Sequence, residues 1–328
     1  MASKNPGGQA SKLEESLTQW LLDSDPSIRW QVMRDLTDAP AAVVAAERSR
    51  VATEGWGAQL LGEQRPGGNW GDGVATQHWR SNLFTLLLLR SLGLDPTSER
   101  ARKAVELVRD RVTWGPEFGN SPFFEGEVEP CINGGVLALG AYFGETSGRL
   151  VDRLLAEQLT DGGWNCEAER GSVRSSFHTT ICVLEGLLQY EKAKGATAAT
   201  TDARARAQEY LLERRMFRRL SSGAVIDSKW TRFTFPTMWH YDVLRGLNYL
   251  HSAGVEPDER VAEAVALVAA RRQPDGRWLL DEPHRDAIHD LEDGAGQPSR
   301  WNTLRALRVL GWHSAVGCSM SARQGGSP

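Results

Sequence analysis

Three side chains of types that commonly bind metals lie near the starts of two successive helical segments. Glu129 and Cys131 stand two positions apart where one segment begins, and His178 follows the start of the next. A carboxylate, a thiolate and an imidazole are ligands that zinc favours, and three protein ligands leave a fourth position open for water or substrate. Glu129, Cys131 and His178 are therefore candidate zinc ligands by residue type. The alternative is a helix-capping anion, a core thiol and a locally satisfied imidazole.

A second group of residues is suited to acid–base chemistry. Glu127 and Glu129 form a carboxylate pair in which one pKa can be raised by the other, so Glu127 is a candidate catalytic acid. His240 and Asp242 lie at the start of a later helical segment. Because the unperturbed pKa of a histidine side chain is near neutral pH, His240 is a candidate general acid/base or a fourth metal ligand. The alternative for His240 is a ring held by local backbone hydrogen bonds.

Aromatic and arginine side chains recur just inside the expected helix starts and are candidates for substrate binding. The aromatic rings would line an apolar or cation-stabilising cavity, or pack in the core. The arginines would bind an anionic group or tie loops to helix ends. The candidates are Trp30, Trp79, Phe177, Trp239, Tyr241, Trp301, Arg80 and Arg300. His284 and His289, in an acidic stretch from 281 to 293, are more readily explained as part of a loop than as a metal site.

These residues must be positioned by a repeated structure. A short sequence motif that begins with Gln, contains Gly and ends with Trp occurs at Gln64–Trp70, Gln158–Trp164 and Gln273–Trp278, each time where a helical stretch stops. We call these the Gln–Trp motifs. Their glycines favour a helix stop and a tight turn, and their Trp can pack the turn down. A repeat of this kind predicts an array of similar supersecondary units.

Two kinds of helical segment alternate six times, with almost no alternating strand pattern. The segments rich in Ala, Arg and Glu are 13–22, 41–54, 98–112, 149–158, 203–215 and 258–272. The segments richer in Gly, Leu and aromatics are 28–37, 77–92, 131–143, 176–190, 237–252 and 300–311. The alternation predicts an all-α fold, a single (α/α)6 toroid with charged helices in an outer ring and apolar helices in an inner ring.

Parallel inner helices would bring their N-termini to one mouth of the toroid, where their partial positive charges converge. The loops leading into these helices are long at 114–130 and 220–236, and long loops in compact domains are usually functional. We therefore expect the ligand site at this mouth.

The three Gln–Trp motifs resemble the glutamine–tryptophan motifs of squalene and oxidosqualene cyclases. The six-fold alternation also resembles the β subunits of protein prenyltransferases, and the likeness spans roughly residues 12 to 313. In prenyltransferases an Asp-x-Cys pair and a later His bind zinc. Glu129, Cys131 and His178 are similar to these three, with Glu in place of Asp, so the resemblance implies a catalytic zinc at these residues.

The chain departs from both families. The stretch 121–128 before Cys131 contains no Arg or Lys to hold a diphosphate, and the acid motif Asp-x-Asp-Asp of the cyclases is replaced by Glu127-Val-Glu129-Pro130. The first reading is a zinc-dependent enzyme of bacterial secondary metabolism, with a small, largely apolar substrate. The second is an acid-initiated, metal-free cyclase that uses Glu127 or Glu129. The third is a non-catalytic binding module.

The composition limits the binding partners and the cellular compartment that we expect. The net charge of −4 favours neither nucleic acid nor an anionic membrane surface as partner. Four irregularly spaced Cys in 328 residues do not form a disulfide framework, which favours a reducing cytoplasm. No apolar run is long enough for a membrane span. We expect flexible tails at 1–11 and 314–328 around a toroid at 12–313, in a monomer or homodimer without an evident protein partner.

Overall fold

The computed structural model describes residues 6–70, 78–284 and 289–324, and it describes side chains for 12–70, 80–284 and 289–315. Within these ranges the chain is mostly helical, and its strands are one antiparallel pair, β1 (Trp278–Leu279) and β2 (Pro298–Ser299). This confirms the prediction of an all-α fold. No helix in the described ranges is both long and apolar enough to cross a membrane.

Two sets of helices carry the two kinds of predicted segment, and the second set contains one additional helix. The apolar set consists of α2 (Pro26–Leu36), α5 (His78–Leu92), α7 (Pro130–Phe143), α9 (Phe177–Lys194), α11 (Val243–Ser252) and α13 (Arg300–Gln324). The other set consists of α1 (Pro6–Leu22), α3 (Ala41–Ser49), α4 (Gly55–Gly62), α6 (Glu99–Arg111), α8 (Gly148–Ala156), α10 (Ala198–Glu213) and α12 (Ala262–Ala270).

Several helix limits differ from those predicted. The predicted segment 41–54 ends as α3 at Ser49 and continues as a short 3-10 turn, and α4 was not predicted. The predicted segment 237–252 begins only at Val243, because Asp242 caps the backbone N–H of Arg245 at 2.7 Å and fixes the start of α11 there. Helices α1 and α13 extend beyond residues 12 and 313, and the domain limits themselves remain a prediction.

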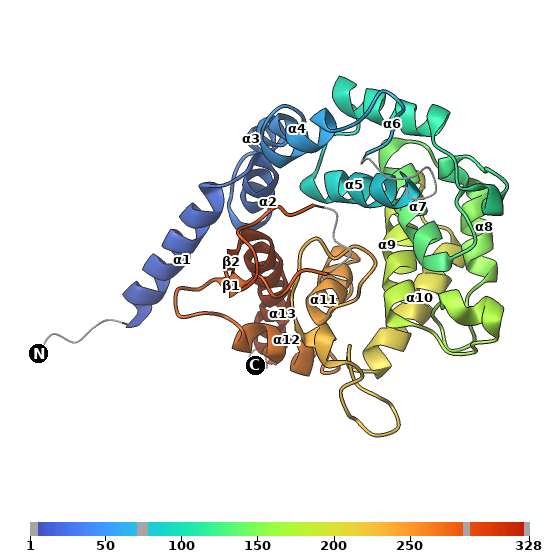
Figure 1. Ribbon diagram of the computed structural model, residues 1–328. Coiled ribbons are helices and arrows are strands. Elements are labelled where there is room, and N and C mark those ends of the chain that lie inside the picture. The colour runs from blue at the N-terminus through green and yellow to red at the C-terminus, as the bar shows by residue number, and fades with distance from the viewer. Residues whose placement is uncertain (1–5, 71–77, 285–288, 325–328) are drawn as a thin grey trace, which may run out of the picture.

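The apolar helices contact one another in chain order. Helix α7 packs on α5 and on α9, α9 packs on α11, α11 on α13, and α13 on α2. Helices α2 and α5 are joined by hydrogen bonds from the Trp30 indole to Leu92 O (2.8 Å) and from the Gln31 amide to Ser91 O (3.2 Å). In Figure 1, α7 to α10 lie on one side, α13 lies near α2, and α1 projects from the rest.

The three repeated Gln–Trp motifs form similar turns. The indole N–H groups of Trp70, Trp164 and Trp278 each donate to the backbone carbonyl ten residues earlier, at 2.7–2.8 Å. The Gln64 and Gln158 amides each donate to two carbonyls, one within the turn and one on the following charged helix, Ala104 or Ala203. The first two turns are therefore tied to the next helix of the charged set, whereas the Gln273 amide donates to Arg271 O.

Helices α7 and α9 approach closely through glycine. A Cβ at Gly134 would lie 2.6 Å from the carbonyl carbon and oxygen of Cys182, and one at Gly186 would lie 2.4 Å from Gly134 O. Real Cβ atoms do not approach backbone this closely, so both positions require glycine. This contact brings the first turns of the two helices together at the cavity described next.

Candidate functional site

A cavity of about 440 Å³ opens where several apolar helices begin. Its walls come from the starts of α5, α7 and α9 and from the segment before α11. The apolar part of the lining is Leu83, Phe84, Leu87, Ile132, Ala138, Met238 and Trp239. The size and lining suit a small, largely apolar molecule. We call it the thiol cavity because Cys131, Cys166 and Cys182 also line it.

Two thiols and one carboxylate meet at this cavity. The Sγ atoms of Cys131 and Cys166 lie 3.1 Å apart, and Cys131 Sγ lies 3.7 Å from Glu129 Oε2. One ligand atom from each of the three residues falls within 4.8 Å of the others. Glu129 and Cys131 stand at the start of α7, where Pro130 occupies the first turn. Cys166 comes two residues after Trp164, the Trp of the second Gln–Trp turn.

The two thiols differ in pKa. The hydrogen bond between the two thiols, together with the contact to the Thr179 hydroxyl (3.4 Å), lowers the pKa of Cys166 although burial opposes this. The same hydrogen bond and burial raise the pKa of Cys131. Cys166 is therefore the first of the pair to become a thiolate, the form in which cysteine binds metals.

His178 lines the thiol cavity but does not join this group. Its Nδ1 accepts a hydrogen bond from the backbone N–H of Tyr241 at 2.8 Å. Burial, with the nearby charges of His240 and Arg245, lowers the pKa of His178 to about 4. The ring is thus neutral at pH 7 and carries its proton on Nε2, so neither nitrogen has a lone pair free for a metal.

The predicted ligand set is therefore revised. The structure keeps Glu129 and Cys131 together and brings Cys166, not His178, to them. Thiolate and carboxylate ligands fit zinc. A tetrahedral zinc with sulfur bonds of about 2.3 Å separates two sulfurs by about 3.8 Å, so the two thiols would move apart slightly on binding.

The other two predicted catalytic carboxylates are engaged by backbone. Burial raises the pKa of Glu127, but its oxygens accept the N–H groups of Val128 and Glu129 just before α7. Unlike Glu129, Glu127 is not part of the cavity lining. Burial likewise raises the pKa of Asp242, which caps α11.

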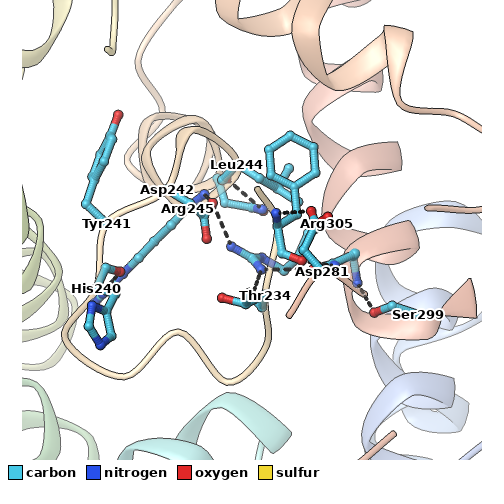
Figure 2. Close-up of polar contacts among 12 residues, drawn as sticks. Thr234, His240, Tyr241, Asp242, Leu244, Arg245, Asp281, Ser299 and Arg305 are labelled. Atoms are coloured by element: carbon cyan, nitrogen blue, oxygen red, sulfur yellow. Dashed lines mark hydrogen bonds and ion pairs between the residues drawn. The ribbon is translucent and has the colours of Figure 1, made fainter. Parts of the chain in front are cut away.

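Asp242 also anchors the segment that leads to α11, as Figure 2 shows. Its Oδ1 lies 3.7 Å from the Arg305 guanidinium, which in turn donates to Thr234 O at 3.1 Å. Arg245 donates to Met238 O and His240 O, and it pairs with both carboxylate oxygens of Glu185 at 2.8–2.9 Å. Two buried arginines therefore hold the segment that carries Trp239 and His240.

His240 lies beside the thiol cavity, in a neighbouring hollow of about 590 Å³ that His178 and Trp239 also line. Its ring stacks on Trp239 at 3.9 Å and on His284 at 3.7 Å between centroids. The His284 Nε2 contacts the Thr234 hydroxyl at 3.0 Å, and the His289 Nε2 contacts the Thr85 hydroxyl at 2.8 Å. Each of the two later histidines is thus engaged with a helix or loop hydroxyl.

The predicted substrate-binding residues divide between cavity and core. Of the eight, Trp239 and Arg80 line the thiol cavity. Phe177, Tyr241 and Trp301 are buried, and Trp30 donates from its indole to Leu92 O. Arg300 lies over the Trp20 ring. The side chain of Trp79 lies outside the described residues.

Sequence reasoning missed Cys166, Glu185 and Arg245, which all line the thiol cavity. Cys166 carries one recognisable signal, since it follows the Trp of a Gln–Trp turn and so stands just before an apolar helix. Glu185 and Arg245 look like ordinary helical charges in sequence, and their 60-residue separation conceals the ion pair.

Comparisons with known proteins find similarity in structure. No protein-family model matches the chain, and no curated protein sequence is similar to it. The chain is similar to the type II terpene cyclase MstE from Scytonema in its apo form, with 18% identity over 92% of this chain and 98% of that chain and a TM-score of 0.45. A variant of MstE in complex with geranylgeranyl dihydroxybenzoate (substrate) matches with 18% identity over 92% and 97% of the two chains and a TM-score of 0.44.

Proposed function

We propose that the chain is a metal-dependent enzyme built as a single (α/α)6 toroid and acting on a small, largely apolar substrate. The proposal of a closed ring rests on the contacts that run from α2 through α5, α7, α9, α11 and α13 back to α2. The proposal of an apolar substrate rests on the lining of the thiol cavity.

One observation carries the proposal of a metal. Glu129, Cys131 and Cys166 present a carboxylate and two thiols within 4.8 Å at the wall of the thiol cavity. The lowered pKa of Cys166 favours the thiolate there. Three protein ligands beside an open cavity match the pattern of catalytic rather than structural zinc sites. Zinc bound there would supply a Lewis acid or an activated water.

The chain's own residues supply the remaining functions. The apolar wall formed by Leu83, Phe84, Leu87 and Met238 binds the substrate and excludes water. His178 is neutral and held through Nδ1 by Tyr241 N, so its Nε2–H is a fixed hydrogen-bond donor, suited to a substrate oxygen. The ion pair of Arg245 with Glu185 keeps the segment with Trp239 against α9.

The second candidate is an acid-initiated, metal-free cyclisation. It is favoured by an apolar cavity with Glu129 in its wall and by the raised pKa of neighbouring Glu127. A protonated carboxyl at this place would donate its proton to an alkene or epoxide. The engagement of Glu127 by backbone N–H groups leaves Glu129 as the acid within reach.

Metal content of protein purified without a His-tag and under reducing conditions tests the proposal. We expect about one zinc per chain by elemental mass spectrometry. Cys131→Ala and Cys166→Ala should each lower the zinc content at least about tenfold. A metal-free chain whose activity on apolar substrates depends on Glu129 would support the acid-initiated cyclase instead, and ligand binding without turnover would support a binding module.

Two variants serve as matched controls. Cys182→Ala removes a third thiol of the same cavity that contacts Arg245 and Trp239 O rather than the other thiols, so it should keep the zinc. His178→Gln should also keep it, because the ring is not a ligand in this geometry. Loss of zinc in His178→Gln with retention in Cys166→Ala would overturn the revised ligand set.

A further inference from the structure

A second chamber adjoins the thiol cavity, with which it shares Glu185 and Arg245. Its volume is about 260 Å³, and its wall comes from the end of α5, the second half of α9, the length of α11 and the first half of α13. Five cationic side chains line it, whereas its lining holds a single carboxylate, Glu185. The five are Arg90, Lys192, Arg245, Arg305 and Arg308. We call this space the basic chamber.

Three of the five cations have a carboxylate partner. Arg245 pairs with Glu185, Arg305 lies 3.7 Å from Asp242, and Arg308 pairs with Asp35. Arg90 and Lys192 form no ion pair with any described residue. The Lys192 ammonium donates to the Ser252 carbonyl at 3.2 Å.

Arg90 lies where three cavities meet. It is only partly exposed, and it lines the basic chamber, a narrow neck of about 60 Å³ and an outer hollow near Trp30. Its guanidinium forms no hydrogen bond with the described residues. Because burying an unpaired charge is costly, such a group normally has a counterion.

Burial and neighbouring positive charges both lower the pKa values of these cations, while the charge of Glu185 opposes the shift at Arg90. Burial lowers the pKa of Arg90 and of Lys192, and the charge of Arg90 lowers that of Lys192 further. Burial also lowers the pKa of Arg308 to about 10, despite its pairing with Asp35. The C-terminal ends of α5, α9 and α11 offer partial negative charge, which offsets only part of this positive charge.

We infer that the basic chamber binds a doubly charged oxyanion of the phosphate type between Arg90 and Lys192. The two uncompensated cations match two negative charges. The guanidinium of Arg90 offers the planar fork of donors suited to phosphate oxygens, and the ammonium of Lys192 stands at the open rim. The inference is independent of the metal, because it rests on residues away from Glu129, Cys131 and Cys166.

The oxyanion can be free or can be the head of a ligand with an apolar tail. The narrow neck shares Arg90 and Glu185 with the basic chamber and shares Phe84, Leu87 and Met238 with the thiol cavity. A tail passing this neck would run from the phosphate to the apolar wall of the thiol cavity. Inorganic phosphate and octyl phosphate therefore distinguish the two sources.

Titration calorimetry at constant ionic strength, with each of these two probes, tests the inference on the full chain. We expect both to bind, and Arg90→Met and Lys192→Met each to weaken binding at least about tenfold. Octyl phosphate binding about tenfold or more tighter than inorganic phosphate would identify a ligand with an apolar tail. Equal affinities would identify a free anion.

Thermal unfolding without added anion gives a second readout. Arg90→Met should raise the melting temperature, because it removes an uncompensated charge. Lys103→Met, at an exposed position of α6, is the control and should change neither binding nor melting temperature. The inference fails if neither phosphate binds, if binding survives in both variants, or if Arg90→Met lowers the melting temperature, which would make Arg90 a structural partner of the helix ends.

Discussion

At the scale of the residue, burial decides which candidate groups can react. His178 and Glu127 are both titratable and both lie near the thiol cavity, yet one is a neutral donor and the other is held by backbone N–H groups. The groups that do contact one another in the cavity wall are the thiols of Cys131 and Cys166, whose sulfurs lie 3.1 Å apart. Chemistry at this site therefore depends on hydrogen bonds that composition does not reveal.

The buried ring of His178 should make stability depend on pH. Its pKa is about 4 in the folded chain and about 6.5 when unfolded. The unfolded chain thus binds the extra proton first, and stability falls as pH drops from about 6.5 to about 4 and levels off below. At about 1.4 kcal/mol per pH unit, the loss is about 3 kcal/mol.

Urea unfolding of the metal-free protein at pH 7 and pH 4.5 measures this effect. The wild-type chain should lose about 2 to 3 kcal/mol more than His178→Gln over this range, because all other titrating groups are common to both. Equal losses in the two proteins would show that His178 titrates normally in the folded state.

The sequence predicted part of this site. Glu129 and Cys131 lie two positions apart, so their proximity is a local property of one helix start. Cys166 joins them through the packing of α7 on α9 and through the Gln–Trp turn before α9. Such contacts between segments are not encoded in residue spacing, so the sequence pattern favours His178 rather than Cys166 as the third ligand.

At the scale of the element, the pairing of α7 with α9 holds the site together. Periodicity and capping residues predicted the existence of both helices, and Gly134 and Gly186 permit their close approach. Helix limits were less predictable where an irregular segment carries helix-forming residues. The segment before Val243 is one example, because buried arginines hold it in a non-helical path.

Gly134→Ala should separate the two helices. Its Cβ would lie 2.6 Å from the Cys182 backbone, which cannot yield as a flexible side chain can. We expect a loss of about 1 to 3 kcal/mol in the free energy of unfolding, with weaker zinc binding because Cys131 is on α7 and Cys166 precedes α9. Urea unfolding and metal titration measure the two effects.

Gly148→Ala is the matched control for this change. Gly148 is the first residue of α8, and a Cβ there would meet no atom within 4 Å. Alanine should be neutral or slightly stabilising at this position, by up to about 1 kcal/mol. If Gly134→Ala were equally harmless, close approach through glycine would not be what positions α7 on α9.

At the scale of the whole molecule, the junction of α2 with α13 joins the two ends of the helical array. Arg308 of α13 pairs with Asp35 of α2, and hydrogen bonds and charges from Arg34 and Arg308 lower the pKa of Asp35 although burial opposes them. In a closed ring this junction supports every helix. In an open array it would support only the two terminal units, since each unit there contacts only its neighbours.

Asp35→Asn distinguishes the two architectures. The change leaves Arg308 without its carboxylate in an already basic chamber, so we expect a loss of about 1 to 3 kcal/mol. In a closed ring the chain keeps one unfolding transition at a melting temperature lower by about 2 to 8 °C. Hydrogen exchange should then accelerate in α7 and α9 as well as in α2 and α13, because they unfold together.

Two further variants complete this test. Asp110→Asn removes an exposed carboxylate of α6 that pairs with Arg109, and it should change stability by less than about 0.5 kcal/mol. Asp35→Asn combined with Arg308→Met removes both partners and should recover much of the lost stability. Faster exchange confined to α2 and α13, with α7 and α9 unchanged, would contradict a closed ring. It would indicate an open array whose ends meet without cooperating.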